Sequence, residues 1–227
     1  MRPALSPQPA AAARDERRSE YDAWAETYPA TAHNPVMRAE QAVVEPVLRR
    51  LSPRRALDVG TGSGRYLDVL TSIGASAVGV DFSMRMLTKS RGSRVCADAR
   101  RLPIRSASMD LVNASLMVGD VDDLAAWARE MTRVLVSGGH LVYSDFHPNW
   151  TRFDWRRTFR DAGGATHEIP FEAHALETHA EAVVDAGLTL RTLRECPLVD
   201  VGDDAASRFR RQYGDAAVLV IIHATAR

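Results

Sequence analysis

The stretch ALDVGTGSGRYLDVL, residues 56–70, decides the fold because its glycines join an apolar run to a helical pattern. The run from Ala56 to Val59 is typical of a buried strand, and residues 65–72 have apolar positions at helical spacing. The three glycines between them are Gly60, Gly62 and Gly64. Glycine loses more conformational entropy on folding than any other residue, so this cluster indicates a backbone that turns tightly or is approached closely. The stretch therefore predicts a strand, a loop suited to a ligand and a helix.

The same alternation of strand and helix patterns continues along the chain. Further strands are predicted at 75–81, 94–98, 109–117, 140–146 and 216–226. Another strand is predicted after Gly187, running through Cys196. Further helices are predicted at 83–90, at 124–136 with Gly138 or Gly139 as C-cap, and from 175 to Gly187. Such alternation favours an α/β fold, with a parallel sheet covered by helices on both faces.

The chain is expected to form one domain over residues 21–227, because 227 residues of which 45% are hydrophobic suffice for a single core. Residues 1–20, rich in proline, alanine and charge, are predicted to be a disordered tail. Residues 21–51 are predicted to form N-terminal helices, the second bent or interrupted at Pro46. Residues 148–173 show no sustained period and are predicted to be a cap insertion.

Charge and cysteine usage restrict the partners and the compartment. Lys+Arg and Asp+Glu number 29 each, so no overall field favours a polyanion, and a nucleic-acid partner is not expected. Cys96 and Cys196 lie in apolar stretches, which predicts buried free thiols in a reducing compartment. No stretch approaches the ~20 apolar residues that cross a bilayer, and the start lacks a signal-peptide core. We expect a cytoplasmic protein without a membrane partner.

Two acids end successive predicted strands beside the glycine loop. Asp81 can accept hydrogen bonds from both hydroxyls of a ribose, and Asp98 suits the amino group of an adenine. A nicotinamide dinucleotide site would explain Asp81 but gives no reason for Asp98, and its G-x-G-x-x-G spacing differs from the G-T-G-S-G of this chain. An adenosyl group is favoured, and a nicotinamide-dependent oxidoreductase is the alternative.

Five segments carry a resemblance to one family through their order. They are LDVGTGSGRY (57–66), GVDFSMRML (79–87), ADARRLPI (97–104), DLVNASLMVGDV (110–121) and GGHLVYSDF (138–146). Together they resemble the class I S-adenosylmethionine-dependent methyltransferases, near the small-molecule group that includes the ubiquinone and menaquinone enzymes. The resemblance covers residues 21–146. It implies a Rossmann-like, seven-stranded, mostly parallel sheet, a final antiparallel strand at 216–226, and S-adenosylmethionine as cofactor.

The resemblance also implies the cofactor-binding residues, which are Tyr28, Asp58, Gly60, Thr61, Gly62, Asp81, Phe82, Met86, Asp98, Ala99, Ser115 and Leu116. The glycine loop and Tyr28 would contact the methionine part, Asp81 the ribose, and Asp98 the adenine, while Ser115 and Leu116 would close the site near the sulfonium. Simpler structural roles stay open for some of these positions: bonds within the loop for Asp58, and core burial for Phe82 and Met86. The neighbouring Gly64 could serve helix packing alone.

A sulfonium is already an activated methyl donor, so the protein mainly has to align a nucleophile and exclude water. Orientation of this kind can supply roughly 7–11 kcal/mol. A general base is needed only for an acceptor that arrives protonated. The candidate bases are Asp145 and His147, where the strand 140–146 ends, and His33, with a structural or exposed role as the alternative. The histidines lack metal-ligand spacing, so no metal is expected.

The acceptor is expected to be a small metabolite. The segment NASLM (113–117) stands where amide- and nucleobase-methylating relatives carry Asn/Asp-Pro-Pro-aromatic, so an oxygen or activated carbon is favoured. Aromatic residues of the cap are predicted to wall an apolar pocket, with a lid or homodimer contact as the alternative; they are Trp150, Phe153, Trp155, Phe159 and Phe171. The cap arginines, at 152, 156, 157 and 160, are predicted to form a solvated face.

The predicted function is methyl transfer from S-adenosylmethionine to such an acceptor, in natural-product biosynthesis. Two alternatives stay open. One is an S-adenosylmethionine-binding enzyme with a non-methylating reaction such as cyclisation, and the other is a non-catalytic partner protein.

Overall fold

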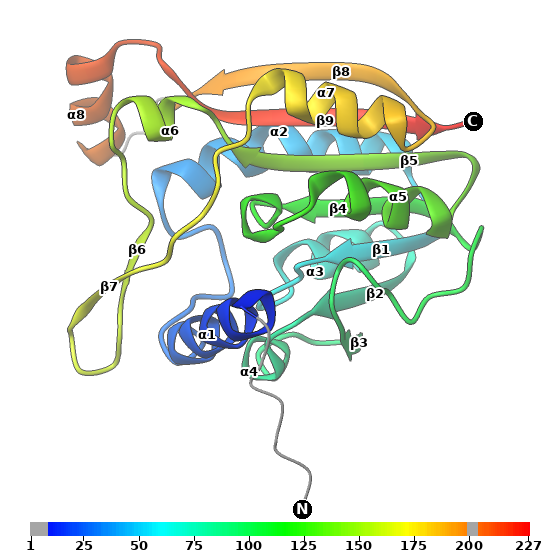
Figure 1. Ribbon diagram of the computed structural model, residues 1–227, viewed down its shortest axis with the longest axis horizontal. Helices are drawn as coiled ribbons and strands as arrows, with labels where there is room; N and C mark the ends of the chain where they lie inside the picture. Colours follow the sequence, from blue (N-terminus) through cyan, green and yellow to red (C-terminus); the bar gives the residue numbers. More distant parts are fainter. Residues whose placement is uncertain (1–8, 199–203) are drawn as a thin grey trace, which may run out of the picture.

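A seven-stranded sheet forms the centre of the computed structural model, which describes residues 9–198 and 204–227. The strand order is β3-β2-β1-β4-β5-β9-β8 (Figure 1). The parallel strands are β1 (Arg55–Val59), β2 (Ser76–Asp81), β3 (Ser93–Cys96), β4 (Met109–Ser115) and β5 (Leu135–Phe146). The last two strands are β8 (Leu188–Pro197) and β9 (Ala217–Ala226), and β9 pairs antiparallel with both β5 and β8. The predicted fold class and the final antiparallel strand are confirmed.

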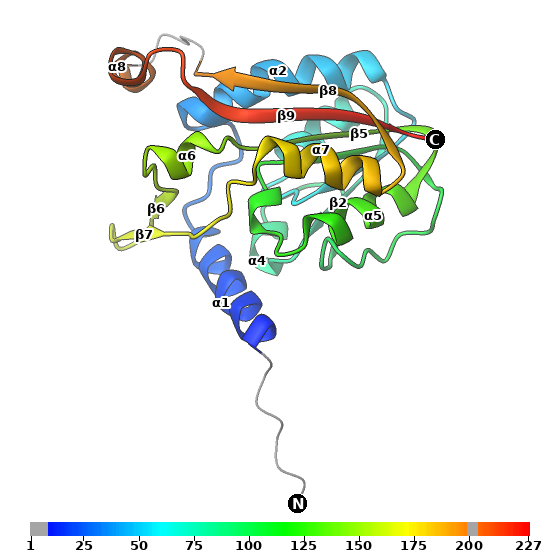
Figure 2. The same cartoon turned by 45° about the horizontal axis from the view of Figure 1, so that its top comes forward.

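Helices cover both faces of this sheet (Figures 1 and 2). On one face lie α2 (Pro35–Leu51) and α3 (Arg65–Ser72), and their buried Leu48 and Leu70 pack with Val142 of β5. On the other lie α5 (Leu124–Val134) and α7 (Leu176–Asp185), where Trp127 packs with Tyr143. Neighbouring β5 residues face opposite layers because strand side chains alternate.

The strand register brings the carboxyl ends of the central strands to one edge. Val59 of β1 lies beside Val80 of β2 and Ala114 of β4, and Ser115 lies beside Ser144 of β5. Loops that follow these strands therefore converge, as expected for a ligand site in an open parallel sheet.

Four segments cover this edge, on the left in Figure 1. They are α1 (Pro9–Trp24), α6 (Asn149–Arg152), the hairpin of β6 (Thr158–Arg160) and β7 (Thr166–Glu168), and α8 (Asp204–Tyr213). The predicted cap insertion contains α6 and the hairpin. The remaining short elements, α4 (Met84–Leu87) and the 3-10 turn η1 (Val118–Asp120), follow β2 and β4.

Several boundaries differ from the sequence predictions. Residues 9–20 are helical rather than part of a disordered tail, because alanines favour α1 and Arg17 and Tyr21 anchor it to Asp120; residues 1–8 lie outside the described part. Helix α2 passes through Pro46 without a break, held by its buried face. The glycines at 138 and 139 lie within β5, where a register shift accommodates them, and do not cap α5.

Two further observations concern the compartment. Cys96 is exposed on the edge strand β3, against the prediction of a buried thiol, whereas Cys196 is buried. Among the helices of the described residues, none combines the length and the apolar character that crossing a bilayer requires.

Candidate functional site

The glycine loop after β1 adopts backbone conformations that favour glycine. Gly60 and Gly62 have φ angles of +69° and +54°, in the left-handed region. A Cβ on Gly60 would lie 2.6 Å from Cγ of Met117, so this position also requires a close approach. At Gly64 a Cβ would lie 2.9 Å from Cβ of Ser90, a contact within the protein that supports the packing role for this glycine.

Two predicted cofactor residues hold the loop from behind. The Thr61 hydroxyl donates to Asp58 Oδ2 (2.6 Å), and Asn113 Nδ2 donates to Asp58 Oδ1 (2.8 Å). Burial raises the pKa of Asp58 to about 6, although both of these hydrogen bonds favour its ionised form. Neither Asp58 nor Thr61 lines the cavity described below. Their contacts are those of residues that shape the loop.

Asp81 ties the end of β2 to this loop. Its Oδ2 accepts from the Gly62 N–H (2.8 Å), and its Oδ1 accepts from the Ser83 N–H (2.9 Å). Each oxygen keeps capacity for another hydrogen bond. Burial raises the pKa of the Asp81 carboxyl to about 6, and the two backbone bonds oppose this shift.

Asp98 is already paired within the protein. Arg100 donates from Nε to Asp98 Oδ1 (3.0 Å) and from Nη2 to Asp98 Oδ2 (2.7 Å). This forked pair lies at the cavity wall, since both residues line the cavity. An adenine amino group at Asp98 would therefore share the carboxylate with Arg100.

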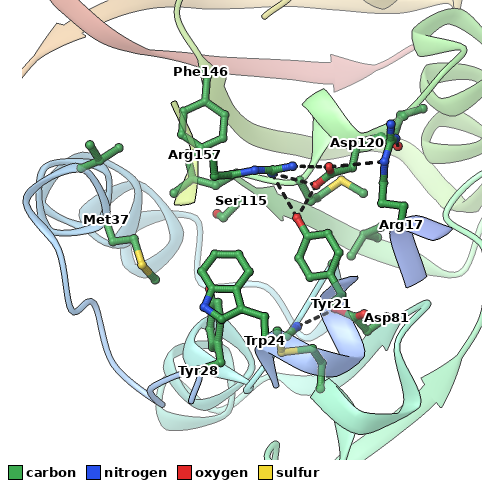
Figure 3. Close-up of a pocket in the computed structure, with 18 of the residues that line it drawn as sticks. Arg17, Tyr21, Trp24, Tyr28, Met37, Asp81, Ser115, Asp120, Phe146 and Arg157 are labelled. Carbon is green, nitrogen blue, oxygen red and sulfur yellow. Dashed lines mark hydrogen bonds and ion pairs between the residues drawn. The ribbon is translucent and has the colours of Figure 1, made fainter. Parts of the chain in front are cut away.

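One cavity of about 580 Å³ collects most of the predicted cofactor residues. Those that line it are Tyr28, Gly60, Gly62, Asp81, Phe82, Met86, Asp98, Ala99, Ser115 and Leu116. Figure 3 shows Asp81, Ser115 and Tyr28 around this space, with Met37 and Phe146 across it. The volume falls within the range of small-molecule sites.

Leu116 has strained backbone geometry where β4 ends. Its φ of +56° lies in the left-handed region, which costs a residue with a side chain on the order of 1–3 kcal/mol. The strain is held by β5, because the Leu116 N–H faces both Oγ (3.1 Å) and the carbonyl (3.0 Å) of Ser144. Ser144 Oγ in turn donates to Glu40 Oε1 (2.9 Å).

Arg65, which directly follows the glycine loop, was missed by the sequence predictions although the stretch GTGSGR displays it. It lines the cavity, and its Nη1 donates to Oε2 of the fully buried Glu40 (2.9 Å). Tyr66 donates its hydroxyl to the same oxygen (2.7 Å). Glu40 thereby fixes Arg65 on one side and Ser144 on the other.

The far half of the cavity is apolar and aromatic. The lining residues there include Met37, Phe146, Trp150, Trp155, Phe209 and Tyr213. Trp155 packs against Phe209 and Tyr213 of α8, with ring centroids 4.8 and 5.1 Å apart. Helix α8 was not predicted. Of the other predicted cap aromatics, Phe153 and Phe171 pack behind this wall, and Phe159 stacks on Trp24 of α1.

Arg157 corrects the prediction that the cap arginines form a solvated face. Its side chain is 8% exposed and donates from Nη2 to Asp120 Oδ1 (2.6 Å) and from Nη1 to Asp120 Oδ2 (3.0 Å). Its remaining donors reach Tyr21 Oη and the carbonyls of Ile169 and Pro170. The guanidinium is thus neutralised and saturated by the protein, which explains why it tolerates burial.

A sequence model described as a methyltransferase domain matches residues 57–143. Demethylmenaquinone methyltransferase of Beutenbergia cavernae is 35% identical over 106 residues, which cover 44% of this chain and 44% of that protein. Malonyl-[acyl-carrier protein] O-methyltransferase of Methylovorus sp. is 28% identical over 200 residues, which cover 81% and 64%. A solved S-adenosylmethionine-dependent methyltransferase from Mesorhizobium loti superposes with a TM-score of 0.63 at 24% identity, over 79% of this chain and 96% of that one.

Residues 57–143 thus match a methyltransferase domain, and the fold is that of a solved S-adenosylmethionine-dependent methyltransferase. The match to the curated relatives is partial, since the chain spans 44% and 64% of the length of the two named above. S-adenosylmethionine is the cofactor that this domain match and this fold imply. The residues present fit this group. Asp81 retains acceptor capacity for a ribose diol. Gly62 faces open space for a ligand, because among the described residues a Cβ there would have only Tyr28 within 4.0 Å.

The three bases predicted for this methyltransferase do not line the cavity. His147 has both ring nitrogens engaged: Nε2 lies 2.8 Å from Glu195 Oε2, and Nδ1 accepts from the Asn149 N–H (3.0 Å). His33 is exposed and lies edge-on to Tyr28, with 5.7 Å between ring centroids; burial lowers its pKa. Asp145 is fully buried behind the cavity wall.

In the described ranges, 9–198 and 204–227, no group of three or more His, Cys, Asp or Glu side chains is arranged to hold an ion.

Proposed function

We propose that this methyltransferase moves the methyl group of S-adenosylmethionine to an oxygen or activated carbon of a small, apolar or aromatic acceptor. One observation carries the proposal: a single cavity runs from the loop and acids suited to the adenosyl group to an aromatic lobe built by Phe146, the cap and α8. Bound S-adenosylmethionine supplies the electrophilic methyl group. The chain's own residues then have to hold the acceptor in line with it and exclude water.

The cofactor half offers complementary contacts for each part of the ligand. Asp81 can accept from ribose hydroxyls, and Asp98 can accept from the adenine amino group beside Arg100. At the opposite end, Arg65 and Tyr28 are suited to the methionine carboxylate, because Arg65 has donors beyond those that Glu40 uses.

The acceptor half favours a planar molecule that is largely apolar. Its walls are aromatic and aliphatic, and the buried guanidinium of Arg157 is already saturated by Asp120 and by carbonyl groups. A carboxylate or phosphate substituent of the acceptor would therefore find no free donor at Arg157. Trp150 and Trp155 both line the cavity, with their rings edge to face and centroids 5.7 Å apart, and they offer aromatic surface on which a ring of the acceptor can pack.

The contacts around β4 support oxygen or carbon rather than amide nitrogen as the acceptor atom. The side-chain amide of Asn113 already donates to Asp58, below the loop. Ser115 is the polar residue of β4 that lines the cavity. The predicted bases are engaged elsewhere or lie outside the cavity. We propose that the acceptor enters already ionised at the atom that is methylated, as a phenolate or an enolate that has lost its proton to solvent before binding.

We extend the proposal to the setting of the reaction. The two free cysteines support a reducing, cytoplasmic compartment, and the aromatic lobe supports an acceptor from natural-product biosynthesis.

The test is transfer of a labelled methyl group. The folded protein is incubated with methyl-labelled S-adenosylmethionine and a panel of phenols, hydroquinones and 1,3-dicarbonyl compounds. Labelled product, abolished in Asp81→Ala, is the expected result. Asp110→Ala is the matched control, since Asp110 also accepts from two backbone N–H groups but lies at the amino end of β4, outside the cavity. Unlabelled product would favour the non-methylating alternative, and absence of cofactor binding would favour the non-catalytic one.

A further inference from the structure

Asp120, at the end of η1, is the common anchor of two covers of the cavity. From the cap, Arg157 donates to both of its carboxylate oxygens. From α1, Tyr21 donates its hydroxyl to Asp120 Oδ2, and Arg17 donates to the Asp120 carbonyl. Figure 3 shows these side chains converging beside the cavity. The Asp120 carboxylate is 7% exposed, so its bonds with Arg157 and Tyr21 are shielded from water.

The covers also contact each other beyond Asp120. Trp24 of α1 stacks on Phe159 of β6 with ring centroids 5.3 Å apart, and Thr27 Oγ1 donates to the Arg160 carbonyl (2.8 Å). Since α1 and the hairpin meet in this way, loosening Asp120 would release both together.

The residue before Asp120 is fixed from two sides. The Gly119 N–H donates to Asp145 Oδ1 (3.1 Å), and the Gly119 carbonyl accepts from the Glu172 N–H (2.9 Å). A Cβ at Gly119 would lie 2.7 Å from the Glu172 carbonyl oxygen and 3.2 Å from Asp145 Oδ1. Hydrogen bonds to Asp145 and from Glu172 therefore fix the turn that carries Asp120.

Asp145 reaches the turn from the core. Its Oδ1 also accepts from the Phe146 N–H (2.8 Å), while its buried Oδ2 lies 3.7 Å from Nε2 of His179 on α7. His179 is itself fully buried, and its Nδ1 lies 3.3 Å from the Tyr143 hydroxyl. Asp145 does not line the cavity, so it cannot touch a substrate there.

We propose that Asp145 is a positioning residue of this methyltransferase: through the Gly119 N–H it holds the η1 turn so that Asp120 keeps α1 and the cap closed over the cavity. This rests on the proposed function only in that the cavity so closed is the site of methyl transfer. The role replaces the direct catalytic one predicted for Asp145 from its place at the end of β5.

The test compares hydrogen exchange of the free protein with that of four variants: Asp145→Ala, Asp145→Asn, Asp120→Asn and the double variant Asp145→Ala/Asp120→Asn. The amides of residues 17–24 and 157–160 report the covers, and those of β1 and β4 report the core. Asp145→Ala should speed exchange in both covers about tenfold and leave the core unchanged. Asp145→Asn should behave as the parent protein, because its side-chain carbonyl still accepts from Gly119.

The double variant distinguishes a positioning role of Asp145 from a merely structural one. If Asp145 acts through Asp120, Asp145→Ala should add less than twofold to cover exchange when Asp120→Asn is already present. Unchanged cover exchange in Asp145→Ala, additive effects in the double variant, or equal loosening of covers and core would overturn the proposal. If Asp145→Ala does not fold, Gly119→Ala disturbs the same contact from the other side and must loosen both covers.

The exchange measurement uses no ligand, so its outcome is independent of the proposed reaction. Titration of the same parent protein with S-adenosylhomocysteine tests the cofactor site separately. Failure to bind would contradict the proposed function and leave the positioning role standing. Binding of S-adenosylhomocysteine by the parent protein, together with unchanged cover exchange in Asp145→Ala, would contradict the positioning role alone.

Discussion

The two halves of the cavity are built by different means. The cofactor half comes from loops that follow β1, β2, β3 and β4, within residues 57–143 that match the methyltransferase domain. The acceptor half comes largely from segments outside that range: α2, α6, α8 and the cap. Short local motifs thus shape the half that we propose binds the cofactor, and distant segments shape the half that we propose holds the acceptor. The two halves should therefore respond to mutation separately.

The largest effect is expected in the cofactor half. Asp81→Ala removes two charge-assisted hydrogen bonds to the ribose, each worth ~1.5–3 kcal/mol, so affinity for S-adenosylhomocysteine should fall at least about 100-fold in calorimetry. The Michaelis constant of the acceptor should change little. Asp110→Ala should retain parent affinity; a comparable loss in that control would mean that the effect is a general one on the fold.

Glu40→Gln tests the support of the cofactor half from α2. The substitution removes the charge that holds Arg65, and weakens the chain of bonds to Ser144 and Leu116. Since a hydrogen bond between charged groups contributes ~1.5–3 kcal/mol, affinity for S-adenosylhomocysteine should fall about tenfold or more. Gln41→Ala is the neighbouring control, because its contact with Arg65 is long (3.4 Å). Equal losses in both variants would contradict the role given to Glu40.

The pH dependence of cofactor binding gives the next largest effect. The pKa of Asp81 in the free protein is raised to about 6 by burial, and a bound ribose diol favours the ionised carboxylate. Below pH 6 the free protein must release this proton on binding, so the dissociation constant should rise up to about tenfold per pH unit as the pH falls. Above pH 7 it should be constant. Asp81→Asn should lose most of this slope, and a slope that persists unchanged would assign it to another group.

The smallest effect is expected in the acceptor half. Trp155→Leu keeps an apolar side chain but removes the stacking wall, worth about 0.5–1.5 kcal/mol. The Michaelis constant of the acceptor should rise about two- to tenfold, while affinity for S-adenosylhomocysteine stays within twofold. Phe153→Leu, behind the wall, is the matched control. Loss of cofactor affinity in Trp155→Leu would show that the halves are not separable.

Most residues predicted to bind the cofactor line one cavity, and the sequence could point to them because its signals are local. Glycines at positive φ and an acid at the end of a β strand can be recognised within a few residues, and the strands around them have clear apolar periods. Asp145 shows where such reasoning stops. As the last polar residue of a strand, it is predicted to face the ligand site. It shares the face of Leu141 and Tyr143, however, so the alternation of strand side chains directs it to the core.

The acceptor half could not be predicted in the same detail because its contacts join distant positions. Arg157 is separated from Tyr21 by 136 residues and from Asp120 by 37, and no local pattern distinguishes it from its exposed neighbour Arg156. Helix α8 has only a narrow apolar face, and its part in the cavity wall follows from its contact with the distant Trp155.

A crystal structure of the protein with S-adenosylhomocysteine tests the central claim most directly. The ribose should lie on Asp81, the adenine beside Asp98, and the sulfur should face the lobe of Phe146 and Trp150. A ligand bound outside this cavity, or one whose sulfur points away from the aromatic lobe, would contradict the division of the cavity into a cofactor half and an acceptor half.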